Sequence, residues 1–220
     1  HIYIGLPPLF KIKQGKNELY LKDVAALNAY LVNNAVENAE LQPAQGAPAI
    51  RGEALEKLML QVVSAQGVME RFAYRVDMDV LQGLLDSRAL QASDFEQAGA
   101  LDSWCIALEA KLNGRGAGKA RYRITSQMAG DEQGGALVIE KQHNGLQVIQ
   151  TVAASQLIQG ELRQITEVAQ ILHGLIQPGA TVQRGGKQLP ISRFAEAQEW
   201  LLEEAKKGRS IQRFKGLGEM

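Results

Sequence analysis

The stretch "ALVIEKQHNGLQVIQTV", residues 136–152, decides the fold class of this chain. Two runs rich in Val, Ile and Leu lie on either side of Asn144-Gly145. Both residues of this dipeptide tolerate the positive φ angles that a two-residue hairpin turn requires. We therefore predict two antiparallel strands here. "ARYRIT", at 120–125, predicts a third strand ahead of them.

Helical patterns flank the predicted strands on both sides. Ser93-Asp94-Phe95-Glu96 is a capping-box pattern, and it predicts the start of a helix that ends at Asn113-Gly114. A second helix follows the strands and ends at His173-Gly174. The apolar stripes of the two helices are Leu101, Trp104, Cys105, Leu108 and Leu112 in the first, and Leu162, Ile165, Val168, Ala169 and Leu172 in the second.

Closer to the start of the chain, a long helical pattern begins at about Glu53, and Gly67 predicts a kink or break in it. The preceding stretch, "AELQPAQGAPAIRG" at 39–52, is rich in Pro, Gly and Ala and is interpreted as a connector. Asp23 is the predicted cap of a helix that runs to about Asn34. Together these patterns predict an α/β (α+β) fold, with helices packed on an antiparallel sheet.

The two ends of the chain each add a hairpin. One has its turn at Gln14-Gly15, and the other spans 181–190 around Gly185-Gly186. Ser192 then predicts the start of a helix with Phe194, Ala197, Leu201 and Ala205 facing inward. The residues predicted to form the core are Leu58, Met59, Val62, Leu101, Trp104, Leu108, Val138, Val148, Ile165 and Val168.

The charge of the chain is balanced overall but not locally. Its 220 residues include 24 basic and 24 acidic ones, so the average charge gives no reason to expect a polyanionic partner. Residues 77–110, however, hold seven acids and one base, and residues 111–123 hold five bases and no acid. A local basic patch matters for nucleic-acid binding even when the total charge cancels.

Several classes of site are disfavoured by the residues. The single cysteine, Cys105, falls on an apolar stripe, which is typical of a buried thiol. The three histidines are far apart and show no metal-ligand spacing. Asp77-Met78-Asp79 is interpreted as a solvated acidic helix end. "GRGAGKA", at 114–120, does not match the phosphate-binding loop pattern. The first glycine that the pattern requires and its final hydroxyl-bearing residue are both replaced by other residues. We therefore expect no metal site and no complete catalytic site.

The sequence shows no apolar run long enough to span a membrane and no signal peptide, so we expect a cytoplasmic protein. It begins at His1 and ends just after a glycine-rich turn, which is typical of a piece cut from a longer chain.

The last residues, "SIQRFKGLGEM" at 210–220, place cations next to glycines. Arg213 and Lys215 share one side of an extended stretch, since alternate strand residues share a face. Gly216 and Gly218 allow backbone amides to approach a ligand without Cβ obstruction. These features fit a phosphodiester clamp. They fit equally well a solvated strand end followed by a helix cap.

The two ends of the chain resemble one known family. "IQRFKGLGEM", at 211–220, and "HIYIGLPPLFKIKQGK", at 1–16, are similar to two segments of the TOPRIM domain in the B subunit of DNA gyrase, a type IIA topoisomerase. In many Gram-negative gyrases a large insert separates these segments. "RGEALEKL", at 51–58, also resembles a stretch of that insert. The resemblance implies a TOPRIM remnant at 1–23, an insert domain at 24–191, and a return helix and strand at 192–220.

The resemblance also implies a function. The parent is expected to be an ATP-dependent enzyme that negatively supercoils DNA by double-strand passage. It would use Mg²⁺ and ATP and would act with the gyrase A protein, as an A2B2 heterotetramer, on double-stranded DNA. The catalytic and metal-binding groups of that enzyme are expected outside this chain, which should be inactive alone. Arg213, Lys215, Gly216 and Gly218 are the implied DNA-binding residues.

The insert is expected to support DNA engagement and the assembly of the gyrase subunits. Its basic segment supplies candidate contacts for DNA or for a partner, namely Arg115, Lys119, Arg121 and Arg123. An alternative from another class is a stand-alone, non-enzymatic DNA-binding or scaffold module, and a third is another enzyme with a TOPRIM domain. If residues 24–191 are an insertion, the chain must leave and return at neighbouring points, so the first and last strands should pair.

Overall fold

Short hairpin turns set most of the strand pairings in this protein. The computed structural model describes residues 8–96, 98–114, 120–128 and 135–214. Asn144 and Gly145 have φ angles of 49° and 79°, and Gly185 and Gly186 have 54° and 81°, as two-residue hairpin turns require. These two predicted turns are confirmed, whereas the turn predicted at Gln14-Gly15 lies one residue later, at Gly15-Lys16, because Gln14 pairs with Asn17. Every strand pair in the described residues is antiparallel.

The described residues form two compact units. Unit 1 comprises residues 8–63 and 176–214, and unit 2 is Ser64–Leu175. Helix α2 (Glu53–Phe72) begins in unit 1 and continues into unit 2. The predicted domain boundaries, after residues 23 and 191, both fall within unit 1.

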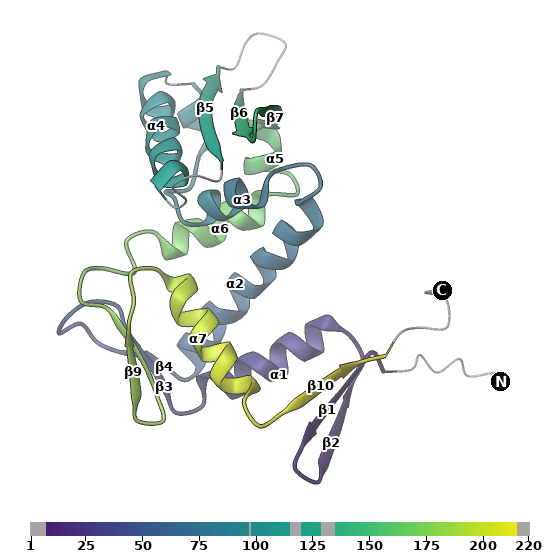
Figure 1. Cartoon of the computed structure of the whole chain (residues 1–220). Coiled ribbons are helices and arrows are strands. Elements are labelled where there is room, and N and C mark those ends of the chain that lie inside the picture. Colours follow the sequence, from purple (N-terminus) through teal and green to yellow (C-terminus); the bar gives the residue numbers. More distant parts are fainter. Residues whose placement is uncertain (1–7, 97, 115–119, 129–134, 215–220) are drawn as a thin grey trace. The chain divides into compact units, whose positions relative to one another are not determined.

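Unit 1 contains a three-stranded sheet in the order β10-β1-β2 (Figure 1). Ile12 lies at its centre, opposite Ile211 on one side and Leu19 on the other. Phe10 and Ile12 are buried. The backbone amide of Phe214 donates to the carbonyl of Leu9 at 2.8 Å, which extends the pairing by one step. These three strands are β1 (Phe10–Gln14), β2 (Asn17–Leu21) and β10 (Ser210–Arg213).

This sheet confirms that the first described strand of the chain pairs with the last one. The register joins Lys13 to Ser210 at one end and Phe10 to Arg213 at the other. The apolar run Ile2-Tyr3-Ile4 also predicts a strand, and it lies outside the described residues.

A four-stranded sheet in the order β4-β3-β8-β9 also belongs to unit 1. The connector predicted at 39–52 is therefore wrong, because its two ends are strands. Ala39 and Leu41 are buried on β3, whereas Pro43 and Gly46 lie in the loop between the two strands. The prolines and glycines of that loop dominate the composition and hide the strands beside it. The strands are β3 (Ala39–Gln42), β4 (Ile50–Arg51), β8 (Thr181–Arg184) and β9 (Lys187–Pro190).

Helices α1 (Val24–Val36) and α7 (Phe194–Lys206) pack against each other in unit 1. As predicted, Asp23 caps α1, and its carboxylate accepts from the amide of Ala26 at 2.7 Å. The predicted inward residues of α7 are all buried. The cap of α7 differs from the prediction by one residue. Arg193 is the N-cap, and Ser192 bonds instead to the carboxylate of Glu196 through its amide and hydroxyl.

Unit 2 is built around the sheet β5-β6-β7, with α4 beside β5 (Figure 1). All three strands lie where the sequence predicts them. Helix α3 packs against α4 and α6. The elements of unit 2 that follow α2 are α3 (Met78–Leu85), the 3-10 helix η1 (Ala92–Phe95), α4 (Ala98–Gly114), β5 (Arg121–Gln127), β6 (Ala136–His143), β7 (Leu146–Ala153), α5 (Ala154–Ile158) and α6 (Arg163–Leu172).

Several local predictions in this part of the chain are wrong. Helix α2 continues through Gly67 without a break. The 3-10 helix η1 includes Ser93, so this residue does not cap α4. Val148 was predicted in the core but is 50% exposed, because β7 is an edge strand. Val138 is half-buried, and the other predicted core residues are buried.

Candidate nucleic-acid interface

The open face of the β10-β1-β2 sheet carries lysines next to aromatic rings. Opposite strand residues share a face, so Lys11, Tyr20 and Gln212 form one row and Lys13, Glu18 and Ser210 the next. The rings of Tyr20 and Phe214 stack at 6.4 Å, with an angle of 9° between their planes. Tyr20 is 51% exposed and Phe214 40%. This face therefore combines cations with accessible π surfaces, which suits contact with nucleic acid.

Part of the positive charge on this face is neutralised within the sheet. The ammonium group of Lys11 lies 2.8 Å from the carboxylate of Glu18 and 5.6 Å from the centre of the Tyr20 ring. The bond to Glu18 raises the pKa of Lys11, and the same bond lowers the pKa of Glu18. Lys13 and Lys16 are exposed and add cations that this pair does not neutralise.

Only one of the four implied DNA-binding residues lies in the described part of the chain. Arg213 ends β10 and is exposed opposite Phe10, so its side chain belongs to the other face of the sheet from Lys11. Lys215, Gly216 and Gly218 lie outside the described residues. Sequence reasoning missed Lys11, Tyr20 and Phe214, although the strand alternation around Gly15 could have placed the first two on one face.

Other cations near the end of the chain have partners inside unit 1. The guanidinium group of Arg209 donates to the side chain of Asn34 at 2.7 Å and to the carbonyl of Ala205. It also lies 6.0 Å from the ring centre of Tyr30. Lys207 pairs with Glu204. Arg209 therefore fixes the connection between α7 and β10 rather than presenting its charge to a ligand.

The second predicted contact region is represented by Arg121 and Arg123. Both are exposed on β5, while Arg115 and Lys119 lie outside the described residues. The two arginines line a hollow of about 350 Å³ on the sheet of unit 2. Glu109 and Glu140 line the same hollow, and Arg123 lies opposite Glu140 in the register. The local charge is therefore mixed rather than basic.

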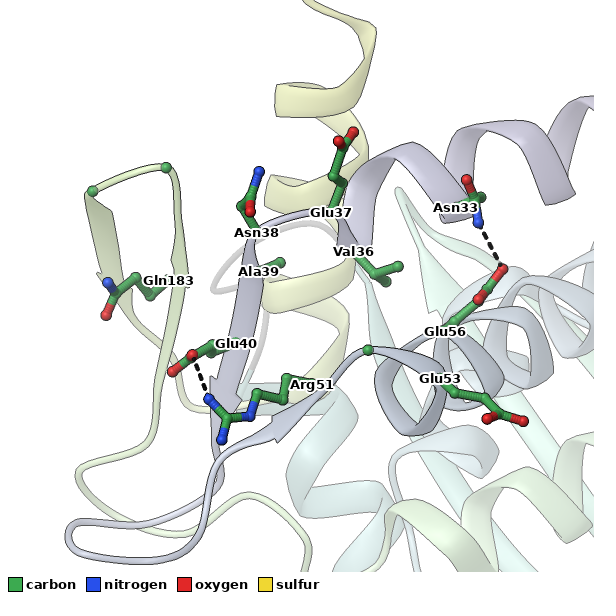
Figure 2. Close-up of a pocket in the computed structure, with 13 residues that line it drawn as sticks. Asn33, Val36, Glu37, Asn38, Ala39, Glu40, Arg51, Glu53, Glu56 and Gln183 are labelled. Carbon is green, nitrogen blue, oxygen red and sulfur yellow. Dashed lines mark hydrogen bonds and ion pairs between the residues drawn. The ribbon is translucent and has the colours of Figure 1, made fainter.

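A larger cleft in unit 1 is acidic (Figure 2). Its volume is about 830 Å³, and it lies between the end of α1, the strands β3 and β4, and the start of α2. Arg51 pairs with Glu40 at 3.2 Å, and Glu56 accepts from Asn33 at 3.3 Å. The carboxylates that line it are Glu37, Glu40, Glu53 and Glu56. Because negative charge dominates, this surface disfavours a phosphate backbone.

The interpretation of Asp77-Met78-Asp79 as a solvated acidic helix end is wrong for Asp77, which is half-buried, whereas Asp79 is exposed in the first turn of α3. Asp77 caps the start of α3 and accepts from the amide of Asp79 at 3.0 Å. Its carboxylate also accepts from the ammonium group of Lys141 at 2.6 Å and from the hydroxyl of Tyr122 at 2.9 Å. The Tyr122 hydroxyl lies 2.9 Å from the carboxylate of Asp79 as well. These acids therefore tie α3 to the sheet.

The bonds at Asp77 change the pKa values around it. Burial raises the pKa of Asp77, but the bonds from Lys141 and Tyr122 outweigh it, so the net pKa is lowered. Burial and the two carboxylates raise the pKa of Tyr122. The described residues bring no three metal-ligating side chains of the His, Cys, Asp and Glu types together.

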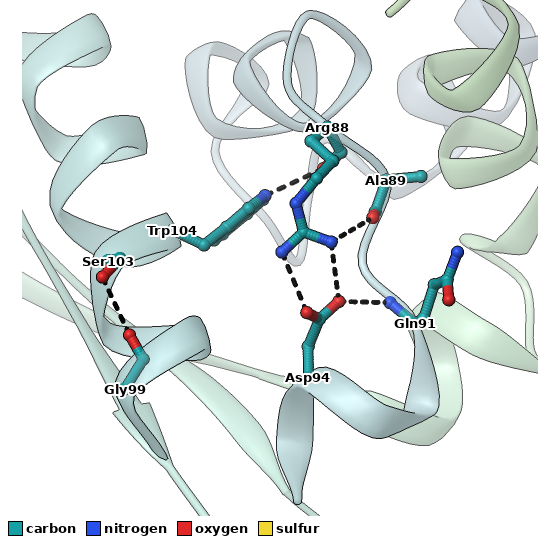
Figure 3. A network of polar contacts seen from close by, with 7 residues as sticks. All are labelled: Arg88, Ala89, Gln91, Asp94, Gly99, Ser103 and Trp104. Atoms are coloured by element: carbon teal, nitrogen blue, oxygen red, sulfur yellow. Dashed lines mark hydrogen bonds and ion pairs between the residues drawn. The ribbon is translucent and has the colours of Figure 1, made fainter. Parts of the chain in front are cut away.

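A second polar network, around Arg88, also holds unit 2 together (Figure 3). The guanidinium of Arg88 donates to both carboxylate oxygens of Asp94, at 2.9 and 3.0 Å. Asp94 also accepts from the amide of Gln91 at 2.7 Å, and the indole of Trp104 donates to the carbonyl of Arg88 at 2.8 Å. Burial raises the pKa of Asp94, but the bonds that its carboxylate accepts lower it overall. The network fixes η1 against α4.

We expect unit 2 to lose stability in acid because of these two aspartates. Both have a folded pKa below the unfolded value, so each contributes stability above about pH 4 that is lost as the pH falls through the folded pKa. Urea unfolding measured from pH 7 to pH 2.5 should show this decline. Asp77→Asn should flatten its slope. The exposed Glu161→Gln is the control, and an unchanged slope in Asp77→Asn would contradict the assignment.

The remaining sequence expectations concern a thiol and membrane helices. Cys105 is buried, and burial raises the pKa of its thiol to about 11, which fits an unreactive core residue. No helix of the described residues has the length and hydropathy that a membrane crossing needs.

Comparison with known proteins identifies the family of the chain. A family model described as the DNA gyrase B subunit insert domain matches residues 39–205. The DNA gyrase B subunit of Rickettsia felis is 26% identical over 228 residues, and that of Caulobacter vibrioides is 29% identical over 220. The type 2 topoisomerase B subunit of Aquifex aeolicus is 24% identical over 220 residues.

Each of these alignments covers all of this chain and 26% of the relative. The chain therefore spans about a quarter of the length of the curated relatives it matches. The family model covers well over half of the 220 residues. The chain belongs to the DNA gyrase B subunit insert domain family.

Proposed function

We propose that this chain is part of the B subunit of a DNA gyrase, an ATP-dependent type II topoisomerase that negatively supercoils DNA by double-strand passage. The observation that carries the proposal is the family match over residues 39–205, together with relatives that are named as B subunits of gyrase or topoisomerase along the whole chain. Gyrase acts on chromosomal DNA, so we place the protein in the cytoplasm.

The pairing of β1 with β10 supports the role of residues 39–205 as an insert. The matched residues lie between two strands that are neighbours in one sheet, with Ile12 opposite Ile211. An insertion leaves its host intact when its two ends meet in this way. We propose that the sheet formed by these strands continues into the TOPRIM domain of the parent.

The proposed DNA contact runs from this sheet into the segment that follows Arg213. In the parent, Lys215 with Gly216 and Gly218 would approach the DNA backbone, and Arg213 would contribute a weaker contact. A cation next to glycines suits phosphate, since backbone amides and the ammonium group both donate to its oxygens. The exposed face with Lys11, Lys13 and the Tyr20–Phe214 stack would add cations and aromatic rings on the sheet that leads into this segment.

The cofactors and partners of the proposed enzyme follow from the same assignment. Mg²⁺ and ATP would bind in parts of the longer protein outside this chain, and the gyrase A protein would complete an A2B2 heterotetramer. Within that complex this chain would support DNA engagement and contacts between the subunits, with Arg115, Lys119, Arg121 and Arg123 as candidate contacts. The isolated chain would be inactive.

Substitution of Lys215 in the full parent enzyme tests the proposal. Lys215→Ala should lower DNA cleavage and supercoiling about tenfold or more, while ATP hydrolysis without DNA and the melting temperature stay unchanged, because the contact is to phosphate. Lys57→Ala, an exposed lysine of α2, is the matched control. Full supercoiling activity in the Lys215 variant would refute the role of this residue.

The sequence of the full-length gene separates this proposal from a stand-alone DNA-binding or scaffold module. The proposal requires an ATPase domain and the acidic TOPRIM motifs upstream of residue 1. A gene without them would refute it.

A further inference from the structure

The hairpin turn of unit 2 determines which backbone groups point away from its sheet. His143 and Leu146 flank the two-residue turn and face each other in the register. Residues that flank such a turn exchange their backbone hydrogen bonds, and the pattern then alternates along the strand. On β7, therefore, Val148, Gln150 and Val152 bond to β6. Gln147, Ile149 and Thr151 direct their amides and carbonyls outward.

The opposite edge of the sheet, at β5, follows the same alternation and is covered. The outward residues there are Tyr122, Ile124 and Ser126. The side chain of Asn113 accepts from the amide of Tyr122 at 2.9 Å and donates to its carbonyl at 2.9 Å. The carboxylate of Glu109 accepts from the amide of Ile124 at 2.9 Å. Helix α4 thus occupies this edge with its own polar side chains and blocks further strand pairing.

The β7 edge has no such cover within the described residues. No described residue forms a hydrogen bond with the outward backbone groups of Gln147, Ile149 and Thr151. Leu146 is 73% exposed, Val148 50% and Ile149 61%. The strand has eight residues, none of them charged, and contains neither proline nor glycine. Natural proteins use such residues, or a covering element, to protect an exposed edge from pairing.

We propose that β7 pairs with β7 of a second copy of this chain, antiparallel and centred on Ile149. In this register Ile149 faces its own copy, and Gln147 faces Thr151 on both sides. Outward residues then meet only outward residues, which allows about six backbone hydrogen bonds. The result is a continuous six-stranded sheet in the order β5-β6-β7-β7-β6-β5.

A second copy is the occupant that the chemistry of the edge favours. The edge requires an extended, uncharged strand with outward backbone groups at alternate residues, and β7 itself has each of these properties. The side chains also match, since Ile149 would pack on Ile149 and Val148 beside Gln150.

Electrostatics do not oppose this symmetric pairing. The nearest charges in the Ile149 and Val148 rows are Glu140 and Lys141 on β6. Neighbouring strands lie about 4.8 Å apart, and the two β6 strands would be separated by three such distances. Glu140 would therefore lie at least about 14 Å from Glu140 of the second copy, and the same holds for Lys141. That separation exceeds the Debye length of about 10 Å at 0.1 M salt, so repulsion between like charges is largely screened.

Sedimentation equilibrium of the full chain over a wide concentration range tests the proposal. The wild type should form a reversible dimer. Ile149→Lys should raise its dissociation constant about tenfold or more, because two ammonium groups would face each other. Ile106→Lys is the matched control, since Ile106 is 68% exposed in the same unit but lies on α4. Circular dichroism and the melting temperature of both variants should match those of the wild type.

Two further measurements test the register. Mixing Ile149→Lys with Ile149→Glu should restore association, because opposite charges would then meet at position 149. Amide exchange of Gln147, Ile149 and Thr151 should slow as the protein concentration rises.

Three outcomes would overturn the proposal. The first is a chain that stays monomeric over the whole concentration range. The second is a dimer that Ile149→Lys leaves unchanged. The third is an edge that pairs only with a strand of another protein.

Discussion

Replacing Trp104 with alanine should lower the free energy of unfolding of unit 2 by about 3–5 kcal/mol. The Trp104 side chain is 6% exposed on α4, and its indole donates to the carbonyl of Arg88 at 2.8 Å. The substitution would remove a large apolar volume from the core and would leave that carbonyl without its donor. It would also weaken the support for the Arg88–Asp94 pair. Urea titration followed by amide exchange of peptides from α3, α4 and β6 would measure the loss.

Ile106→Ala is the control for this experiment. Ile106 lies on the same helix but is 68% exposed, so its replacement should change stability by no more than about 0.5 kcal/mol. A loss below about 1 kcal/mol in Trp104→Ala would mean that the core of unit 2 does not depend on this side chain.

Replacing Ile12 with alanine should destabilise the β10-β1-β2 sheet by about 2–5 kcal/mol. Ile12 is 2% exposed and lies between Ile211 and Leu19 at the centre of the sheet. The loss should be largest in amides of β1 and β10, because these strands share the cavity that the substitution leaves. Amide exchange as a function of urea would show it.

The neighbouring Lys13→Ala is the matched control, because Lys13 is exposed on the opposite face of the same strand. Equal exchange rates in the two variants would contradict the central role of Ile12. Separation of β10 from β1 would also displace Arg213 and the segment after it. If the proposed function holds, Ile12→Ala should therefore reduce DNA cleavage by the parent enzyme indirectly.

The sequence predicted those elements whose signals are local. Asn144-Gly145 and Gly185-Gly186 have a backbone requirement that few other residues meet, so both hairpins were found. Asp23 was recognised as a cap because its short carboxylate reaches an amide three residues ahead. The family resemblance at the two ends correctly predicted that β1 and β10 would meet.

Elements that depend on distant partners were missed. The strand at Ala39–Gln42 exists because β8 pairs with it from about 140 residues away, and nothing in its own composition shows this. Val148 has the alternation of a core residue, but β7 has no neighbour on its outer side among the described strands. Asp77 looked solvated because Tyr122 and Lys141, its partners, are far along the chain.

The candidate site was the least predictable part. The signal for Arg213 and the residues after it came from the family resemblance, since cations next to glycines also fit a plain strand end. The Tyr20–Phe214 stack joins two residues from opposite ends of the chain, and only the pairing of β1 with β10 makes them neighbours.

The pairing of Lys13 with Ser210 also bears on how such a gene could gain or lose a domain. Directly opposed residues of an antiparallel pair can be joined by a tight two-residue turn. An Asn-Gly dipeptide between Lys13 and Ser210 would thus replace everything in between and leave the β1–β10 ladder as a simple hairpin. Such an exchange would need one cut in each strand, and it would also remove β2, so β1 would keep β10 as its remaining neighbour in this sheet. Shortened and extended versions of the protein would then differ by a single genetic event.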